Sequence, residues 1–418
     1  MTAMRYKQTK IWLLSLLNGF FMLVFAFYWL SLPYTFGDEA FLIKWSSLVK
    51  KSLFGFDAKP LPDDIFFVDV SNSKTVIDAV NEFGDTSPYH RKVITDREHL
   101  IAFFKMLNQH QQDIRFVLCD VIFEDETPYD SLLAKEFSAL GKKLLGVSYL
   151  TNTGEYIPPV IDILHAPATY TATQNLFLKF PLILSDTLKT VPLMMYENLH
   201  DKHLNRKGFF YRFDGQLSLP SPIVDFKVRN ADFGVSANPD KPDFTVWKMS
   251  TILWMRDNAD AEELKTFFKN KIVLIGDFQD DIHNTPFGQM PGLLIIYNAY
   301  LTLVSKQHLV SVGWMCFLLL AFSMISYRIL LDVKVEKPQW LLNIFQSRFG
   351  QIILNSLDEV VLLTIITLLS YFLFNIHINI LILLIYLKTI EFLWKKALKR
   401  RRRKSSEIEI QNTAISDY

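Results

Sequence analysis

The chain has 418 residues, of which 50% are hydrophobic and 14% aromatic, and its 44 Lys and Arg nearly balance its 43 Asp and Glu. This balance excludes a protein that binds nucleic acid along a broad basic surface unless its charges are segregated, and the apolar content excludes a disordered chain. The charges are segregated, because eight of the ten residues at positions 395–404 are Lys or Arg. The rest of the chain is therefore net acidic.

The first predicted element is a transmembrane helix at residues 11–32, after a cytoplasmic N-terminus of residues 1–10. Ile11–Leu30 carries no charge, and its length matches a hydrocarbon core of about 30 Å at ~1.5 Å per residue. A cleaved signal peptide also follows basic residues, but its apolar core is shorter and ends in small residues. Aromatic residues end this one, so we expect an uncleaved anchor.

Residues 33–308 are predicted to form an α/β domain with a mainly parallel sheet. Strands and helices alternate in its first part: Ile65–Val70, a helix from the capping box at Thr95 to Gln109, Ile114–Cys119, Ser131–Leu140 closed by Gly141, and Lys143–Tyr149. This alternation favours parallel strands with right-handed crossovers.

Its last part contains another buried-strand run, Lys271–Gly276, and a helix from about Pro291 to Val304, which we expect to continue toward the membrane at Ser311. The middle, roughly residues 151–250, is rich in proline and predicts loops and shorter strands that cover the sheet.

The C-terminal third holds two further apolar runs. Gln307–Tyr327 predicts a membrane helix at 309–331, followed by a cytoplasmic connection at 332–355. Val360–Leu387 has no formal charge and is long for one helix and short for two. One crossing would place the two basic ends of the chain on opposite sides of the membrane, against the positive-inside tendency, whereas two crossings make both cytoplasmic.

Two crossings also explain Asn375–Asn379 as a polar hairpin. We therefore expect helices at 356–375 and 376–394 and a basic cytoplasmic tail at 395–418, with a re-entrant loop as the open alternative. The expected fold class is an α/β extracytoplasmic domain plus four transmembrane helices, one N-terminal and three C-terminal. The cytoplasmic segments are too short for a catalytic domain, so a signal would leave through a partner.

A resemblance is carried by these segments: Val68–Ser71, His90–Arg91, Val117–Phe123, Asp130, Lys271–Gly276, Thr285–Gly288 and Met290–Gly292. In this order, with three apolar runs after them, they resemble the second-type CHASE domain family. The resemblance covers roughly Asp63–Leu150 and Lys271–Val304. It implies an extracytoplasmic sensory module of the kind found beside cyclases and histidine kinases.

The sequence departs from the family pattern in three ways. Val70–Ser71 stands where the family often has a second acid, and Tyr297 stands where it often has a His. The family's output domain is not found. These departures bear on the ligand chemistry and the output more than on the fold.

Three acids mark the expected ligand-binding edge of the sheet. Asp69, Asp120 and Asp277 each lie at or beside the carboxyl end of a predicted parallel strand, where ligands bind in open α/β sheets. An Asp at a strand end also caps the next turn, and that alternative stays open for each. The ligand-binding candidates are Asp69, Ser71, Arg91, Asp120, Asp277, Asp281 and Thr285.

Arg91 could pair with an anionic ligand or with Asp69, or tie its loop to the sheet. Asp281 and His283 have a spacing that also occurs in metal sites, but no second His or Cys cluster supports one, and we expect no metal. Thr285–Gly292 is interpreted as a rigid loop that sets the entry of the following helix.

No catalytic motif is found. The sequence lacks a nucleophile elbow, a phosphate-binding Gly-rich loop and a His-Glu-x-x-His pair. The two cysteines, Cys119 and Cys316, lie in separate apolar runs and form no redox motif. We expect neither an enzyme nor a cofactor, and an envelope hydrolase using Asp69 and Asp120 is a third hypothesis beside the two given below.

The basic cluster is expected to bind anionic lipid at the inner leaflet. It consists of Lys395, Lys396, Lys399, Arg400, Arg401, Arg402, Arg403 and Lys404. The leading hypothesis is a sensor or sensory subunit in a bacterial inner membrane that passes an envelope signal, or a small extracytoplasmic ligand's signal, to a separate protein. The alternative is a non-sensing accessory subunit of an envelope complex. A homo-oligomer stays open, and no nucleic-acid partner is expected.

Overall fold

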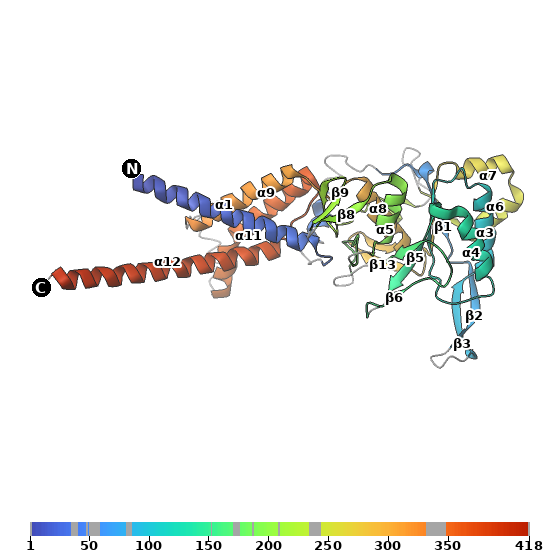
Figure 1. Ribbon diagram of the computed structural model, residues 1–418, viewed down its shortest axis with the longest axis horizontal. Coiled ribbons are helices and arrows are strands. Elements are labelled where there is room, and N and C mark those ends of the chain that lie inside the picture. The colour runs from blue at the N-terminus through green and yellow to red at the C-terminus, as the bar shows by residue number, and fades with distance from the viewer. Residues whose placement is uncertain are drawn as a thin grey trace. The chain divides into compact units, whose positions relative to one another are not determined.

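The computed structural model describes residues 2–34, 41–46, 49, 59–80, 86–151, 153–169, 176–185, 188–207, 210–233, 244–331 and 348–416 (Figure 1). The chain divides into two compact units. The helical unit comprises Met1–Leu32, Phe36–Ser47 and Val310–Tyr418, and the α/β unit comprises Pro33–Thr35 and Leu48–Leu309.

The α/β unit is built on a sheet whose strand order is β11-β1-β12-β4-β5-β6, with β7 also paired to β5. All of these pairs are parallel except β5–β6. The strands are β1 Ile65–Asp69, β4 Phe116–Asp120, β5 Leu144–Leu150, β6 Tyr156–Ile157, β7 His165–Pro167, β11 Val246–Lys248 and β12 Ile272–Gly276. The expected parallel sheet is confirmed.

Helices cover both faces of this sheet (Figure 1). One core packs alternate strand residues such as Phe66 and Val117 against α3 (Arg97–Gln109), α4 (Asp130–Leu140), α6 (Met249–Asn258) and α7 (Ala261–Phe268). The other core packs Phe67 and Leu118 against α5 (Val191–His200) and α8 (Gly292–Val304). Because both faces are buried, the strands are apolar runs without alternation, which made them recognisable in the sequence.

The expected helix after β3 is confirmed, but its cap differs. Asp96, and not Thr95, is the N-cap of α3, because its carboxylate accepts hydrogen bonds from the Glu98 and His99 N–H groups. An Asp and a Thr are both good N-caps, so the sequence alone did not decide between adjacent residues.

The middle of the unit is only partly as expected. It contains the short antiparallel strands β8 (Leu204–Lys207), β9 (Phe210–Phe213) and β10 (Gln216–Ser218), but also the buried helix α5. Among the described residues it also contains the 3₁₀ turn Asn230–Asp232, and two further 3₁₀ turns, Pro62–Asp64 and Gly141–Lys143, precede β1 and β5. The prediction of loops and strands alone was wrong for α5, whose Pro192 stands in the first turn, where a proline starts a helix.

Two β-hairpins were not expected. β2 (Lys74–Val80) and β3 (Thr86–Thr95) form an antiparallel pair directly after β1. β13 (Ile282–Thr285) and β14 (Gly288–Pro291) form another before α8, in the segment interpreted as a rigid loop. Both hairpins border the site described below.

The helix that begins at Pro291 does not continue to Ser311, and that expectation was wrong. α8 ends at Val304, where Lys306 adopts a left-handed conformation with φ 57°. After the short strand β15 (Leu309–Val310), the Ser311 hydroxyl accepts a hydrogen bond from the Trp314 N–H and caps a new helix, α9 (Val312–Leu330). The chain thus makes a turn between the two helices.

The helical unit contains α1 (Thr2–Ser31), α9, α11 (Arg348–Phe374) and α12 (Ile380–Ser416). Among the described residues, three helical segments are long and apolar enough to cross a membrane: Gln8–Ser31, Val312–Leu330 and Ser356–Phe374. Most of the expected cytoplasmic connection, residues 332–347, lies outside the described part of the chain.

Candidate functional site

The strand ends bring the three predicted acids to one edge of the sheet. Asp69 and Asp120 end β1 and β4 and are both in register with Gly276, the last residue of the strand between them. Asp277 follows immediately. A side chain at Gly276 would press on Leu293 of α8, so glycine allows this helix to approach the sheet edge closely.

The Asp69 carboxylate forms hydrogen bonds within the fold. Its carboxylate accepts hydrogen bonds from the Ser71 N–H at 2.9 Å, the Ser71 hydroxyl at 2.8 Å and the Phe278 N–H at 3.2 Å. Both Asp69 and Ser71 are buried. This pair ties the turn after β1 to the loop after β12, which is the capping role weighed as the alternative.

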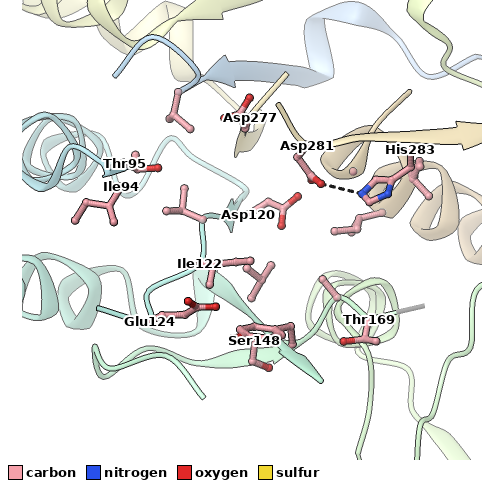
Figure 2. A pocket seen from close by; sticks show the side chains of 18 of the residues that line it. Ile94, Thr95, Asp120, Ile122, Glu124, Ser148, Thr169, Asp277, Asp281 and His283 are labelled. Carbon is pink, nitrogen blue, oxygen red and sulfur yellow. Dashed lines mark hydrogen bonds and ion pairs between the residues drawn. The ribbon is translucent and has the colours of Figure 1, made fainter. Parts of the chain in front are cut away.

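A cavity of about 530 Å³ opens at the same edge (Figure 2). Asp120, Asp277, Asp281 and His283 line it from the strand ends and the β13 loop, and Ser148 lines it from β5. Asp69 and Ser71 do not line it. Apolar side chains from β5, α8, the residues directly after β4 and the segment 176–180 form most of the remaining wall.

Asp277 is fixed by three hydrogen bonds. It accepts from the Lys74 ammonium at 2.6 Å and from the N–H groups of Gln279 and Asp280 at 2.9 and 2.8 Å. Burial by itself would raise the pKa of Asp277, but these hydrogen bonds together hold the pKa below its ordinary value. Asp277 therefore stays ionised and anchors β2 through Lys74.

A second lysine anchors the other strand of the hairpin. The Lys92 ammonium on β3 lies 2.8 Å from both Glu124 and Asp125, in the loop after β4. Partial burial opposes these charges, yet pairing holds the pKa of Lys92 above its ordinary value and that of Glu124 below it. The β2–β3 hairpin is therefore tied by both strands to the rim of the cavity.

Asp281 lies against the first residue of α8. One of its carboxylate oxygens is 2.8 Å from His283 Nε2 (Figure 2). A Cβ atom at Gly292 would lie 2.1 Å from the other oxygen. Only glycine leaves room for this carboxylate at the start of the helix.

Asp120 differs from the other acids. Among the described residues, its carboxyl group has neither a hydrogen bond nor an ion pair, and it points into the cavity (Figure 2). Burial, together with the nearby charges of Asp281 and Asp277, raises the pKa of Asp120 well above its ordinary value. Within the described part of the chain, the Asp120 carboxyl group in the cavity is thus unpaired.

The comparison with protein families agrees with this architecture. A family model described as the CHASE2 domain matches residues 20–327. The chain belongs to the CHASE2 domain family. The match confirms the resemblance noted in the sequence, and it also covers the middle segment, where no resemblance was recognised. No curated protein and no solved structure matches the chain significantly.

CHASE2 domains are extracytoplasmic sensory domains. The matched region contains the whole α/β unit and extends into α1 and α9, the helices that precede and follow it in the chain. With its apolar helices, the protein is a membrane-anchored chain that carries an extracytoplasmic sensory domain.

Two candidate residues of the CHASE2 domain lie away from the cavity. Arg91 is on β3, 68% exposed, and its Nε is 3.9 Å from Asp78 on β2, so within the described residues it pairs with Asp78 and not with Asp69, which was one of the alternatives given for it. Thr285 is buried in the β13–β14 turn, where its hydroxyl donates to the Gly288 carbonyl at 2.7 Å. Neither residue lines the cavity.

The basic cluster lies on α12, which continues through it as a helix. Lys395 pairs with Glu391 at 2.5 Å, and Lys396 lies over the ring of Phe392. The side chains of residues 401–404 lie outside the described residues.

Sequence reasoning missed the two lysines at the cavity. Lys74 and Lys92 were not recognised because no strand was predicted between β1 and α3. Residues 74–80 and 91–95 contain β-branched residues such as Val76, Ile77 and Val93, and this composition was the available signal for a hairpin.

Proposed function

We propose that this CHASE2 protein is a sensor of a bacterial inner membrane, which binds a ligand in the cavity outside the cytoplasm and passes the signal to a separate partner protein. The cavity carries this proposal, because its wall includes Gly292, Ile295 and Ile296 of α8. A short connection joins α8 to the membrane helix α9. In this proposal the chain binds and signals, and the reaction that reads the signal belongs to the partner.

Four membrane crossings are supported by contacts within the helical unit. The Tyr386 hydroxyl of α12 donates to Asn18 Oδ1 at 2.9 Å, and Asn18 Nδ2 donates to Ser326 of α9 at 2.8 Å. Asn18 is near the centre of the Gln8–Ser31 segment. A side chain of α12 that reaches Asn18 lies at the same membrane depth, and interhelical hydrogen bonds of this kind hold membrane helices together.

The hairpin between α11 and α12 is placed on the outer side in this proposal. His377 Nε2 is 3.0 Å from the Ser46 hydroxyl, and Ser46 follows the C-terminal end of α1 in the chain. With the basic residues in the first part of α1 and those at positions 395–404 of α12 in the cytoplasm, the positive-inside tendency is satisfied. Reporters fused after Asn379 and after Lys404 should report opposite sides, outside and inside, and two reporters on one side would refute this topology.

The route of the signal follows the helices that flank the sensory domain. α1 and α9 pack closely: the rings of Trp12 and Tyr327 stack at 4.3 Å, and a Cβ atom at Gly19 would lie 2.4 Å from the Ser323 hydroxyl. A shift of α8 on ligand binding would move α9 against α1, and this two-helix pair is the element whose equilibrium the ligand biases.

The proposal is tested with the full chain in lipid nanodiscs and a panel of anionic, neutral and cationic small molecules. At least one compound should raise the unfolding temperature of the wild type, because a ligand that binds only the folded state stabilises it. Ile122→Trp should abolish this shift by filling the cavity mouth, while Leu61→Trp, at an exposed position outside the cavity, should keep it. If no compound in the panel gives a shift that depends on the cavity, this result would contradict sensing.

Transmission is tested separately by co-purification of membrane partners with and without that compound. Gly19→Leu should keep the unfolding-temperature shift and lose the ligand-dependent change in the partner, since it separates α1 from α9. Phe20→Leu, at an exposed position on the same helix, serves as the control. A partner that is recovered equally in all samples would instead favour a non-sensing accessory subunit.

A further inference from the structure

Some charged groups that line the cavity have a partner of opposite charge in the chain, and others do not. Both lysines at its rim are neutralised by carboxylates of the chain itself. In the same lining, the Asp120 carboxyl group and the Asp281 oxygen beside Gly292 have no hydrogen bond or ion pair within the described part of the chain. A ligand that is a positively charged hydrogen-bond donor would match these two acceptors.

The rest of the wall is apolar. Phe177 and Phe180 line the cavity on one side, and Ile295 and Ile296 of α8 line it on another. Val147 of β5 and Ile122 after β4 add further apolar surface. Sites that combine apolar walls with a few placed polar groups bind small organic molecules.

The geometry does not favour a metal ion as the cation. In the part of the chain that the structure describes, no group of three or more His, Cys, Asp or Glu side chains is arranged to hold one. Divalent cations such as Mg²⁺ and Ca²⁺ prefer several oxygen ligands. An ammonium group needs only two or three acceptors, which Asp120 and Asp281 supply.

We propose that the cavity binds a small organic amine, whose ammonium group pairs with Asp120 and Asp281 and whose apolar body lies against Phe177, Phe180 and Ile295. The proposal rests on the proposed function, because it names the ligand class of the same sensory site. Pairing allows Asp120 to ionise beside Asp281, because the ammonium group forms a charge-assisted hydrogen bond with each carboxylate. It also links α8 to the ligand through Asp281, which lies against Gly292.

The test uses three probes of similar shape: 2-phenylethylamine, 2-phenylethanol and 3-phenylpropionate. Their binding to the full chain is measured by calorimetry in nanodiscs of uncharged lipid, so that the membrane itself does not attract the amine. The amine should bind at least about tenfold more tightly than the other two probes. Asp120→Asn should weaken its binding by about tenfold or more, while the exposed control Asp162→Asn should leave it unchanged.

Several results would overturn the amine proposal. The alcohol or the carboxylate could bind as tightly as the amine or more tightly, or none of the three probes could bind. Amine binding could also be unaffected by Asp120→Asn, or Mg²⁺ or Ca²⁺ could displace the amine at a concentration lower than that of the amine. An anionic or neutral compound whose binding is lost in Ile122→Trp would refute the amine but keep the sensor. Both the sensor proposal and the amine proposal would be refuted only if no anionic, neutral or cationic compound binds in a way that depends on the cavity.

Discussion

Asp69 ends β1 and Asp120 ends β4, on the two sides of β12, and both are in register with Gly276. Their carboxyl groups nevertheless differ in hydrogen bonding and in access to the cavity. Asp69 accepts three hydrogen bonds and is buried outside the cavity. Asp120 has no partner among the described residues, lines the cavity and has a pKa well above its ordinary value. The same residue type at equivalent positions thus serves the fold in one case and is available to a ligand in the other.

The largest effect is expected from Asp69→Ala. Removing the carboxylate leaves buried N–H donors without an acceptor, which should lower the free energy of unfolding of the α/β unit by about 3 kcal/mol. Denaturant unfolding of the full chain in detergent measures this. A loss below about 1 kcal/mol would show that Asp69 is not the structural member of the pair.

Asp120→Asn should have the opposite sign at neutral pH. Since the folded-state pKa of Asp120 is raised, the folded protein binds more protons than the unfolded one between the ordinary pKa and the raised one, and its stability falls as pH rises through this window. Because Asn does not ionise, the variant lacks this cost. Its free energy of unfolding should exceed that of the wild type by about 1 kcal/mol at pH values above this window. The gain should vanish in acid, and destabilisation at neutral pH would contradict it.

Lys92→Met should loosen the β2–β3 hairpin with a smaller effect. Lys92 is 42% exposed, so solvent screens its pairs, and the expected loss is about 0.5–1 kcal/mol. Hydrogen exchange of β2 and β3 should accelerate and depend on salt in the wild type. Because the pKa of Glu124 is lowered, this tether should weaken as pH falls through that pKa, opposite to the trend for Asp120. Unchanged exchange would mean that the lysines do not hold the hairpin.

Arg91→Ala should have the smallest effect. The exposed Arg91–Asp78 pair, at 3.9 Å, is expected to contribute less than about 0.5 kcal/mol. Thermal unfolding and binding of the cavity ligand should both match the wild type. Loss of ligand binding in this variant would show that Arg91 takes part in the binding site.

The sheet and its acids could be predicted from the sequence for physical reasons. Strands buried on both faces are continuous apolar runs, and Asp at the end of such a run places a carboxyl group at the edge where parallel strands end. Asp69 and Asp120 were therefore located correctly. What each carboxyl group contacts depends on Ser71, Phe278 and the β13 loop, which local patterns do not bring together.

Other parts of the site depend on contacts across the fold. Lys74 and Lys92 reach the cavity only because the β2–β3 hairpin pairs in the observed register, and Gly292 gains its role only when Asp281 lies against α8. The break between α8 and α9 was missed because the turn at Ser305–His308 is short and apolar residues precede and follow it. In each case a few long-range contacts outweighed the local pattern.

The most direct test of the account is the titration of the Asp120 carboxyl group by ¹³C NMR on aspartate-labelled full-length protein in nanodiscs, with Asp120→Asn identifying the signal. One aspartate signal should titrate well above the ordinary range and should be converted to the ionised form when 2-phenylethylamine is added. An Asp120 signal that titrates in the ordinary range, or that does not respond to the amine, would contradict the claim that this carboxyl group is held unpaired for a ligand.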